Sequence, residues 1–461
     1  MKTKRIAAAL LAALMLIPMI MTGCVRPEPA QPDPTEPAPT EDTRPAVREP
    51  GKIEVTKVDY PKNPYTVSDP NKIDASMEAA WSEAMRIRRA ASVSAAKMDS
   101  FTKALADALT AEDGKNTVFS PANIYIALAM LAETCDGETR TEILSALGAA
   151  DMPSLRRGVS SLITAETVDD GITTSLLANS LWLNNRIGFN TDTLERIAEN
   201  YSASSYWGDM ADPAFNEELR NWLNDNTGGL LKDAANGVRL DPLTVLAICS
   251  TIYFKAPWSD RFHGAATDKQ IFHTKDGDIT VDFMHKTVSG CDYFKGSGFT
   301  AAADKVVGGK VWYLLPDEGV SVEDMLKNGG LDYVLGDHTA DESRRVAFSV
   351  PKIDVSSDLD LIPALRKMGV NSCFDCSVAD FSPLTDESEG LEVSEVKHAA
   401  RVKTDEDGIE AAAYTVIMIA YGAAPSPMDY VEFTLDRPFA FVVTGETGAP
   451  LFIGVVNTPN N

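Results

Sequence analysis

The chain has 461 residues, of which 44% are hydrophobic, and this length is enough to bury one large core or two ordinary ones. It carries 67 acidic and 42 basic residues, which gives a formal net charge of -25. Nucleic acid is therefore excluded as an expected partner, because phosphate binding needs a basic surface.

Residues 1–23 have the features of an export signal. Lys2, Lys4 and Arg5 make a charged start, and an apolar run follows from Ile6 to Met21. The run is short for a membrane-spanning helix and is typical of the central region of a signal peptide.

The signal ends in Met21-Thr22-Gly23-Cys24, which resembles the processing site of a bacterial lipoprotein. The resemblance implies that Cys24 becomes the lipidated first residue of a mature protein on the extracellular face of a bacterial cell membrane. Several acyl chains would hold it there, since each buried methylene contributes about 0.8 kcal/mol. An ordinary signal peptide cleaved nearby is the alternative.

The composition of residues 24–75 predicts a disordered tether. Residues 25–50 contain eight prolines mixed with Glu, Asp, Thr and Ala, and apolar side chains are scarce. Such a segment is extended, at about 3 Å per residue, and would hold a domain away from a cell surface. Residues 76–98 are left unassigned, although Met77–Val93 has helical character.

Residues 99–461 are predicted to form one globular domain that begins with helices. Ser120-Pro121 is typical of an N-cap followed by the first helical position. Apolar residues recur at helical spacing in four segments: 101–109, capped by Asp99 or Ser100; 121–131; 143–147, capped by Thr139; and 215–223.

Strands dominate the second half of the domain. Leu243–Phe254 is nearly all apolar and predicts a strand buried on both faces. Val311–Leu315 and Val346–Val355 are further predicted strands, and Phe439–Thr444 pairs with Leu451–Val456 as a hairpin. Helices followed by strands, without alternation, indicate an α+β fold.

Catalytic motifs are missing from the sequence. None of the five histidines lies in an H-E-x-x-H motif, and no G-x-S-x-G, phosphate-binding loop or dinucleotide fingerprint occurs. Cys373-Phe-Asp-Cys376 is a single C-x-x-C pair, for which two surface thiols or one local disulfide are favoured over zinc. We therefore expect no enzyme, catalytic residue, metal or cofactor.

The stretch from Val393 to Phe439 strongly resembles the hinge, reactive-centre loop and C-terminal strands of the serpin family. Four further segments resemble serpin signatures and occur in family order: Asn116–Ile124, Tyr253–Trp258, Leu315–Gly319 and Phe452–Asn457. The resemblance implies a serpin fold, in which helices pack around large, mostly antiparallel β-sheets and the reactive-centre loop is exposed.

The hinge and loop suit insertion into a sheet. Gly408 permits backbone angles closed to other residues, and alternation along a strand puts Glu410 on the opposite face from Ile409. Because Glu410 must face water, Ile409 belongs to the buried face. Most inhibitory serpins have Thr or Ser where Ile409 stands and a small residue where Tyr414 stands. By the resemblance the hinge comprises Glu406, Gly408, Ile409, Glu410, Ala411, Ala412 and Ala413.

Two core features are also implied by the resemblance. Ser120, Asn123, Ser250 and His398 match the family's shutter, a hydrogen-bonded cluster in the core, although Ser and Asn have exchanged places. Lys352 and Glu406 match an ion pair at the top of the sheet. An exposed pair there would contribute a few tenths to about 1 kcal/mol.

The implied function is a suicide trap for a protease, which cuts the loop and is held as an acyl-enzyme while the loop inserts. Family counting places the cut at Gly422-Ala423, and bonds after Met418, Ala420, Tyr421, Ala423 or Met428 stay open.

Residues 409–436 lack Arg and Lys, which disfavours trypsin-like targets. Elastase-, subtilisin- and chymotrypsin-like serine proteases are favoured, and a papain-like cysteine protease stays open. We expect a monomer. The rival hypotheses are a non-inhibitory serpin acting as a surface binding module, supported by Ile409 and Tyr414, and a surface enzyme on an unrelated fold.

Overall fold

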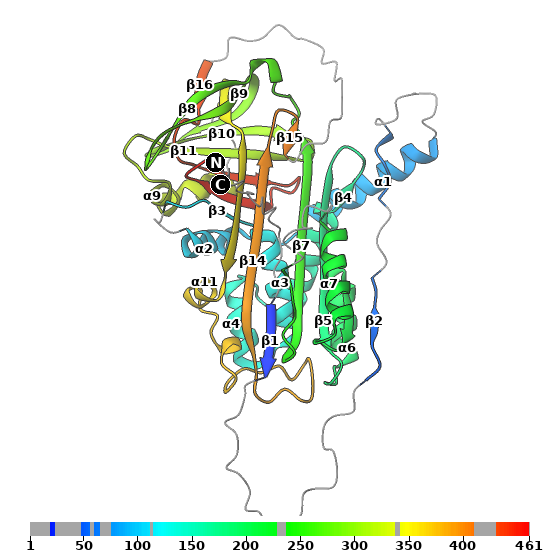
Figure 1. Cartoon of the computed structure of the whole chain (residues 1–461). Helices are drawn as coiled ribbons and strands as arrows, with labels where there is room; N and C mark the ends of the chain where they lie inside the picture. The colour runs from blue at the N-terminus through cyan, green and yellow to red at the C-terminus, as the bar shows by residue number, and fades with distance from the viewer. Residues whose placement is uncertain are drawn as a thin grey trace, which may run out of the picture.

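The computed structural model describes residues 19–23, 48–55, 60–64, 75–110, 114–227, 237–336, 342–409 and 430–460. Two nine-stranded sheets organise these residues (Figure 1). The main sheet has the order β1-β14-β15-β7-β5-β6-β2, with β13 beside β14 and β4 beside β5. Its strands are β1 (Met19–Gly23), β2 (Gly51–Ile53), β4 (Val168–Asp169), β5 (Thr174–Asn184), β6 (Ala203–Gly208), β7 (Thr244–Pro257), β13 (Ile353–Asp360), β14 (Leu391–Thr404) and β15 (Gly408–Ile409).

The second sheet has the order β16-β12-β9-β10-β11-β17-β18-β3, with β8 beside β9. Among the strand pairs of the described residues, β5–β6 and β12–β16 are parallel and the others are antiparallel. The strands are β3 (Thr117–Phe119), β8 (Asp268–Thr274), β9 (Gly277–Lys295), β10 (Phe299–Val306), β11 (Gly309–Pro316), β12 (Glu342–Pro351), β16 (Tyr430–Thr434), β17 (Phe439–Thr444) and β18 (Pro450–Val456).

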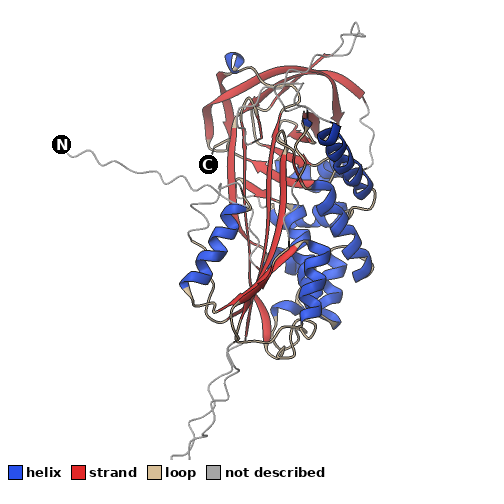
Figure 2. Cartoon of the chain, turned by 90° about the vertical axis from the view of Figure 1, so that its right-hand side faces the viewer, coloured by secondary structure: helices blue, strands red, loops and turns tan. Residues whose placement is uncertain are grey.

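Helices cover both faces of the main sheet (Figure 2). α7 packs on one face, where Phe215 lies 5.2 Å from the Trp182 ring of β5. α3 lies on the other face, between the main sheet and β18, and every one of its residues is buried. The helices are α1 (Ala75–Ser92), α2 (Asp99–Leu109), α3 (Pro121–Thr134), α4 (Gly137–Ala146), α5 (Met152–Glu166), α6 (Thr191–Tyr201), α7 (Pro213–Asp225), α9 (Val322–Met325), α10 (Leu331–Leu335) and α11 (Ile362–Lys367).

The predicted α+β architecture is confirmed, and local signals located several of its elements. Ser120 caps α3 by accepting a hydrogen bond from the backbone N–H of Asn123 at 3.2 Å. β7 is buried on both faces from Thr244 to Ile252, and β17 and β18 pair as the predicted hairpin.

Three predicted boundaries were wrong. α2 is preceded by Met98 at the cap position, and Asp99 is already helical. α4 starts at Gly137 after Asp136, two residues before the predicted cap at Thr139. The predicted strand Val346–Val355 is two strands, because the chain leaves the second sheet at Pro351 and enters the main sheet at Ile353.

The N-terminal region contains more structure than its composition predicts. Within the predicted tether, β2 pairs with the edge strand β6, so Gly51 to Ile53 do not belong to a disordered segment. A tether strand can bind a sheet edge through its backbone without a core of its own. The last five residues of the predicted signal form β1 in the main sheet. Among the described residues, no helix is long and apolar enough to span a membrane.

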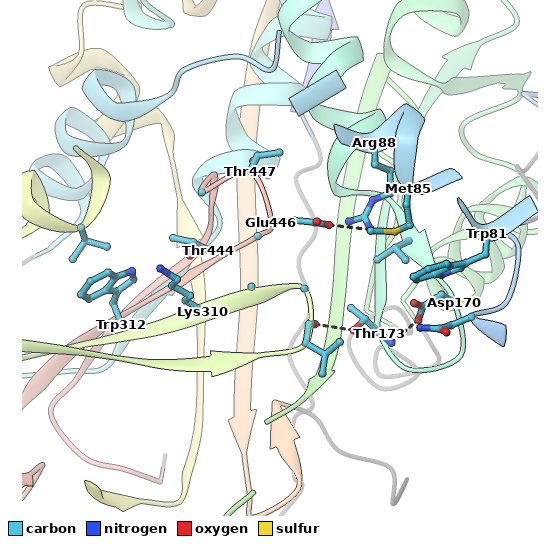
Figure 3. A pocket seen from close by; sticks show the side chains of 18 of the residues that line it. Trp81, Met85, Arg88, Asp170, Thr173, Lys310, Trp312, Thr444, Glu446 and Thr447 are labelled. Atoms are coloured by element: carbon cyan, nitrogen blue, oxygen red, sulfur yellow. Dashed lines mark hydrogen bonds and ion pairs between the residues drawn. The ribbon is translucent and has the colours of Figure 1, made fainter. Parts of the chain in front are cut away.

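The helical character of Met77–Val93 corresponds to α1, which packs against α5. Arg88 fixes the contact: its Nε donates to the carbonyl oxygen of Ala165 at 2.9 Å, and Nη1 lies 3.2 Å from Glu446 (Figure 3). A cavity of about 630 Å³ separates α1 from β11 and the β17–β18 turn. Its charged groups are engaged, since Arg88 pairs with Glu446 and Lys310 with Asp292.

We expect Arg88→Met to detach α1 from the domain. Hydrogen bonds to a charged group contribute about 1.5–3 kcal/mol, so the free energy of unfolding should fall by roughly 1–3 kcal/mol, with faster proteolysis between α1 and α2. Urea unfolding and limited proteolysis check this. The matched control is Arg86→Met on the same helix, whose side chain is 68% exposed and should change stability by less than about 0.5 kcal/mol. Equal effects of the two variants would contradict the docking role of Arg88.

Candidate functional site

The candidate site is the slot between β7 and β14, which we define as the space for one strand in the middle of the main sheet. At the upper end β15 fills it, with Ile409 opposite Thr404 of β14 and Ala256 of β7. At the lower end β1 fills it and pairs with the same two strands. Since β7 and β14 are each antiparallel to these segments, they run parallel to each other, with room for one antiparallel strand between them.

The hinge residues Gly408 and Ile409 already form the first two positions of an inserted strand. A Cβ atom on Gly408 would lie 2.3 Å from the carbonyl oxygen of Ala256, so glycine is needed for close approach of two backbones. The sequence analysis assigned glycine to this position for its freedom of backbone angles. That reason does not apply, because Gly408 is not among the residues with positive φ. Ile409 is 4% exposed and belongs to the main hydrophobic core.

A tight turn holds the hinge at the top of β7. Trp258 donates from its indole Nε1 to the carbonyl oxygen of Asp405 at 2.8 Å, and from its backbone N–H to that of Asp407 at 3.1 Å. The Asp405 carboxylate accepts hydrogen bonds from the backbone N–H groups of Asp407 and Gly408. Arg261 adds an ion pair with Asp407 at 3.2 Å.

Lys352 and Glu406 form an ion pair at 2.8 Å, and Thr267 donates to the same Glu406 carboxylate at 2.7 Å. Burial alone would raise the pKa of Glu406, but the hydrogen bonds from Lys352 and Thr267 outweigh it and the pKa is lowered. Because both side chains are partly exposed, the pair contributes at most about 1 kcal/mol.

A buried ion pair packs against the Trp258 ring, and the sequence analysis did not predict it. Lys286 of β9 lies 2.7 Å from Asp304 of β10, with the two side chains 3% and 2% exposed. The Lys286 ammonium is 4.9 Å from the Trp258 ring centroid and 4.2 Å from that of Phe262. Burial lowers the pKa of Lys286 and, against the attraction of Lys286, raises that of Asp304 to about 6.

The four predicted shutter residues lie together behind the slot. His398 of β14 accepts at Nε2 from the backbone N–H of Ser120 at 2.9 Å. Asn123 donates from Nδ2 to the carbonyl oxygen of Ser250 at 3.0 Å, and the Ser250 hydroxyl contacts the Asn123 amide oxygen. That hydroxyl also lies 2.7 Å from the amide oxygen of Asn179, a fifth member on β5. The only sequence signal for Asn179 is an amide inside an apolar run.

Other predicted positions fall outside the described residues. These are Cys24, the hinge residues Glu410, Ala411, Ala412 and Ala413, and the cleavage candidates Met418, Ala420, Tyr421, Gly422, Ala423 and Met428.

The Cys373-x-x-Cys376 pair differs from both predicted alternatives. Cys373 is buried with a free thiol, whereas Cys376 is disulfide-bonded. Within the described ranges, no group of three His, Cys, Asp or Glu side chains could hold a metal ion.

Comparison with known proteins identifies this architecture. The family model for serpin (serine protease inhibitor) matches residues 96–459, so α1 lies outside it. The chain is 29% identical to Serpin-ZX of Arabidopsis thaliana, covering 76% of this chain and 94% of that protein. It is 32% identical to putative serpin-Z6A of Oryza sativa, covering 75% and 94%.

Solved structures give the same result. The crystal structure of the thermophilic serpin Tengpin in the native state superposes with a TM-score of 0.69 at 25% identity, covering 79% of this chain and 93% of that one. AtSerpin1 of Arabidopsis in its native stressed conformation gives 0.67 at 26% identity, covering 81% and 98%.

We expect His398 to make the fold sensitive to acid. Burial lowers its pKa to about 3 from 6.5, so the unfolded chain binds the proton more readily between these values. The stabilisation is complete above pH 6.5 and is lost as the pH falls toward 3, by up to about 1.4 kcal/mol per pH unit. Urea unfolding of the wild type and of His398→Gln at several pH values measures it.

The difference in free energy of unfolding between the wild type and His398→Gln should shrink as the pH falls, because only the wild type loses the contribution of His398. The contribution of Asp304 is common to both proteins and cancels. The exposed His273→Gln serves as the control and should follow the wild type. A constant difference between wild type and His398→Gln would show that His398 does not titrate in this window.

Proposed function

Because the chain belongs to the serpin family, we propose that it inhibits a protease by inserting its cleaved reactive-centre loop into the slot. The observation that carries this proposal is the double pairing of β15. Gly408 and Ile409 hydrogen-bond within a slot bounded on both sides by strands, so the loop residues that follow, down to the level of β1, have two partner strands available. Insertion can therefore proceed by extending a strand that already exists.

The unusual Ile409 is compatible with this mechanism. Its side chain already occupies a buried position at the top of the slot, so no further step has to bury it. This observation favours an inhibitor over the rival hypothesis of a non-inhibitory binding module, for which Ile409 was part of the support. The buried position of Ile409 also supports the parity in which alternate loop residues after it face the core.

The proposed chemistry uses the target's own nucleophile. The protease hydroxyl, or thiol, attacks the carbonyl carbon of the cut bond, the amine of the following residue leaves, and an acyl-enzyme forms. Release of the tension at the cut lets the loop extend β15 downward. About 14 inserted residues span roughly 45 Å, and this movement would carry the attached protease along the sheet and distort its active site before water attacks the ester.

The target class is proposed from the loop sequence. The chain from Ile409 to Asp436 has no Arg or Lys, so the side chains before any cut bond are small, aliphatic or aromatic. We propose elastase-, subtilisin- or chymotrypsin-like serine proteases, with Gly422-Ala423 and the neighbouring bonds after Met418, Ala420, Tyr421 and Ala423 as cleavage sites.

An extracellular position with a lipid anchor at Cys24 is proposed from the signal sequence, and it requires that the Cys24 sulfur carry the lipid and not a disulfide with Cys376. The arrangement of the described strands supports it. β2, the first described strand after Cys24, lies toward the lower end of the main sheet, whereas β15 and β16, which flank the loop, lie at the upper end (Figure 1). An anchor attached through the N-terminal region would therefore present the loop away from the membrane.

We expect the chain from residue 24 onward to form covalent complexes with elastase, subtilisin and chymotrypsin but not with trypsin. Denaturing gels should show a band at the summed mass, and mass spectrometry of the released C-terminal fragment should identify the cut bond. Cleavage in the loop by all of these proteases, with no covalent band from any, would contradict inhibition and favour the binding module.

We expect Ile409→Glu to convert the inhibitor into a substrate, because a carboxylate at this buried position would have to leave the slot or lose its charge. The fraction of protease trapped should fall at least about ten-fold, since burying an unpaired charge costs more than about 1.4 kcal/mol. The neighbouring Glu410→Gln is the matched control and should trap as the wild type does. If Ile409→Glu trapped normally, strand extension from β15 would be the wrong mechanism.

A further inference from the structure

The lower half of the slot holds a segment from the opposite end of the chain. β1 lies between β14 and β7 and hydrogen-bonds to both (Figure 1). Met19 is opposite Val396 of β14 and Ile248 of β7, and Ile20 is opposite Glu395 and Ala247. β1 is antiparallel to both neighbours, which is the direction that β15 has at the upper end.

The two registers show which loop positions β1 would displace. Ile409 is opposite Thr404 and Ala256. A loop that continued this register for eight more residues would put Ile417 opposite Val396 and Ile248, which is the place of Met19 on both sides. The sequences of the two segments are alike: Met19-Ile-Met-Thr22 and Ile417-Met-Ile-Ala420 are both uncharged and largely apolar.

One slot position cannot hold two backbones, because neighbouring strands are about 4.8 Å apart and each edge offers a single set of hydrogen bonds. With β1 in place, an inserted loop could extend only to the residue before Met19's position. At its own level β1 pairs the backbone groups of β7 and β14 that face the slot, and without it these groups are free to pair with an inserted loop or, since the two strands run parallel, with each other.

We propose that β1 is a plug: residues 19–23 close the slot in the unprocessed chain, and removal of the leader before Cys24 opens it. The proposal rests on the proposed function, since the slot matters only if the loop inserts. During export the plug would keep the loop from inserting prematurely. After processing, the slot-facing groups of β7 and β14 at this level are released and become available to an inserting loop.

Occupancy of the slot is measurable without any protease. Two forms are compared by hydrogen–deuterium exchange: the full chain produced without export, and the chain that starts at residue 24. We expect the slot-facing amides of 244–248 and 391–396 to exchange at least about ten-fold more slowly in the full chain, because β1 pairs antiparallel with both strands there, whereas the shortened chain offers them only the weaker parallel pairing of β7 with β14.

Two proline variants of the full chain test the segment itself. Proline cannot donate to a strand ladder, so Ile20→Pro should expose the same amides as removal of the leader. Leu11→Pro, earlier in the leader, should leave them protected.

Protease trapping then separates the two proposals. We expect the full chain to be cleaved with at least about ten-fold less trapping than the shortened chain, and Ile20→Pro to restore it. If the slot-facing amides are protected only in the full chain but neither form traps a protease, the plug is supported and the inhibitory function is overturned. Equal exchange in the two forms would overturn the plug whatever the trapping result.

Discussion

The arrangement of β7 and β14 is the constraint on which the rest of the structure depends. The two strands run parallel, and among the described residues they are bridged by β15 and β1, each a few residues long. Every backbone N–H and C=O group facing the slot needs a partner, and a complete strand would supply all of them at once. In the proposed mechanism an inserted loop is that strand, so the loop sequence determines how much of the ladder it can fill.

Polar contacts hold the upper end of this slot and the strands that border it. At the upper end Trp258 hydrogen-bonds to the turn before Gly408, and its ring packs against the ammonium of the buried Lys286–Asp304 pair. Behind the slot, Asn123 of α3 holds Ser250 of β7, while Ser120 holds His398 of β14. Directional bonds of this kind fix the register of each strand more narrowly than apolar packing does, because a hydrogen bond is lost when its groups shift by less than 1 Å. They therefore hold the two strands that border the slot in fixed register.

Sequence reasoning located the elements that depend on residues close together in the chain and missed the contacts between residues that are far apart in it. The Ser120-Pro121 helix start, the apolar strand β7 and the β17–β18 hairpin each depend on neighbours in the chain. Lys286 and Asp304 look like ordinary surface charges in the sequence, and only the β9–β10 packing buries them against Trp258. Gly408 was assigned to the hinge for its conformational freedom, whereas its contact with Ala256 is what requires glycine. The hinge was predicted through family resemblance, since the sequence from Glu406 to Ile409 does not by itself indicate pairing with β7 and β14.

β2, the first described strand after Cys24, and β15 lie toward opposite ends of the same sheet, and this has a mechanical consequence for the proposed trap. Full insertion would carry the cut end of the loop from the level of β15 toward the end at which β2 lies. A trapped protease of about 230 residues, roughly 45 Å across, would then sit between the domain and the membrane.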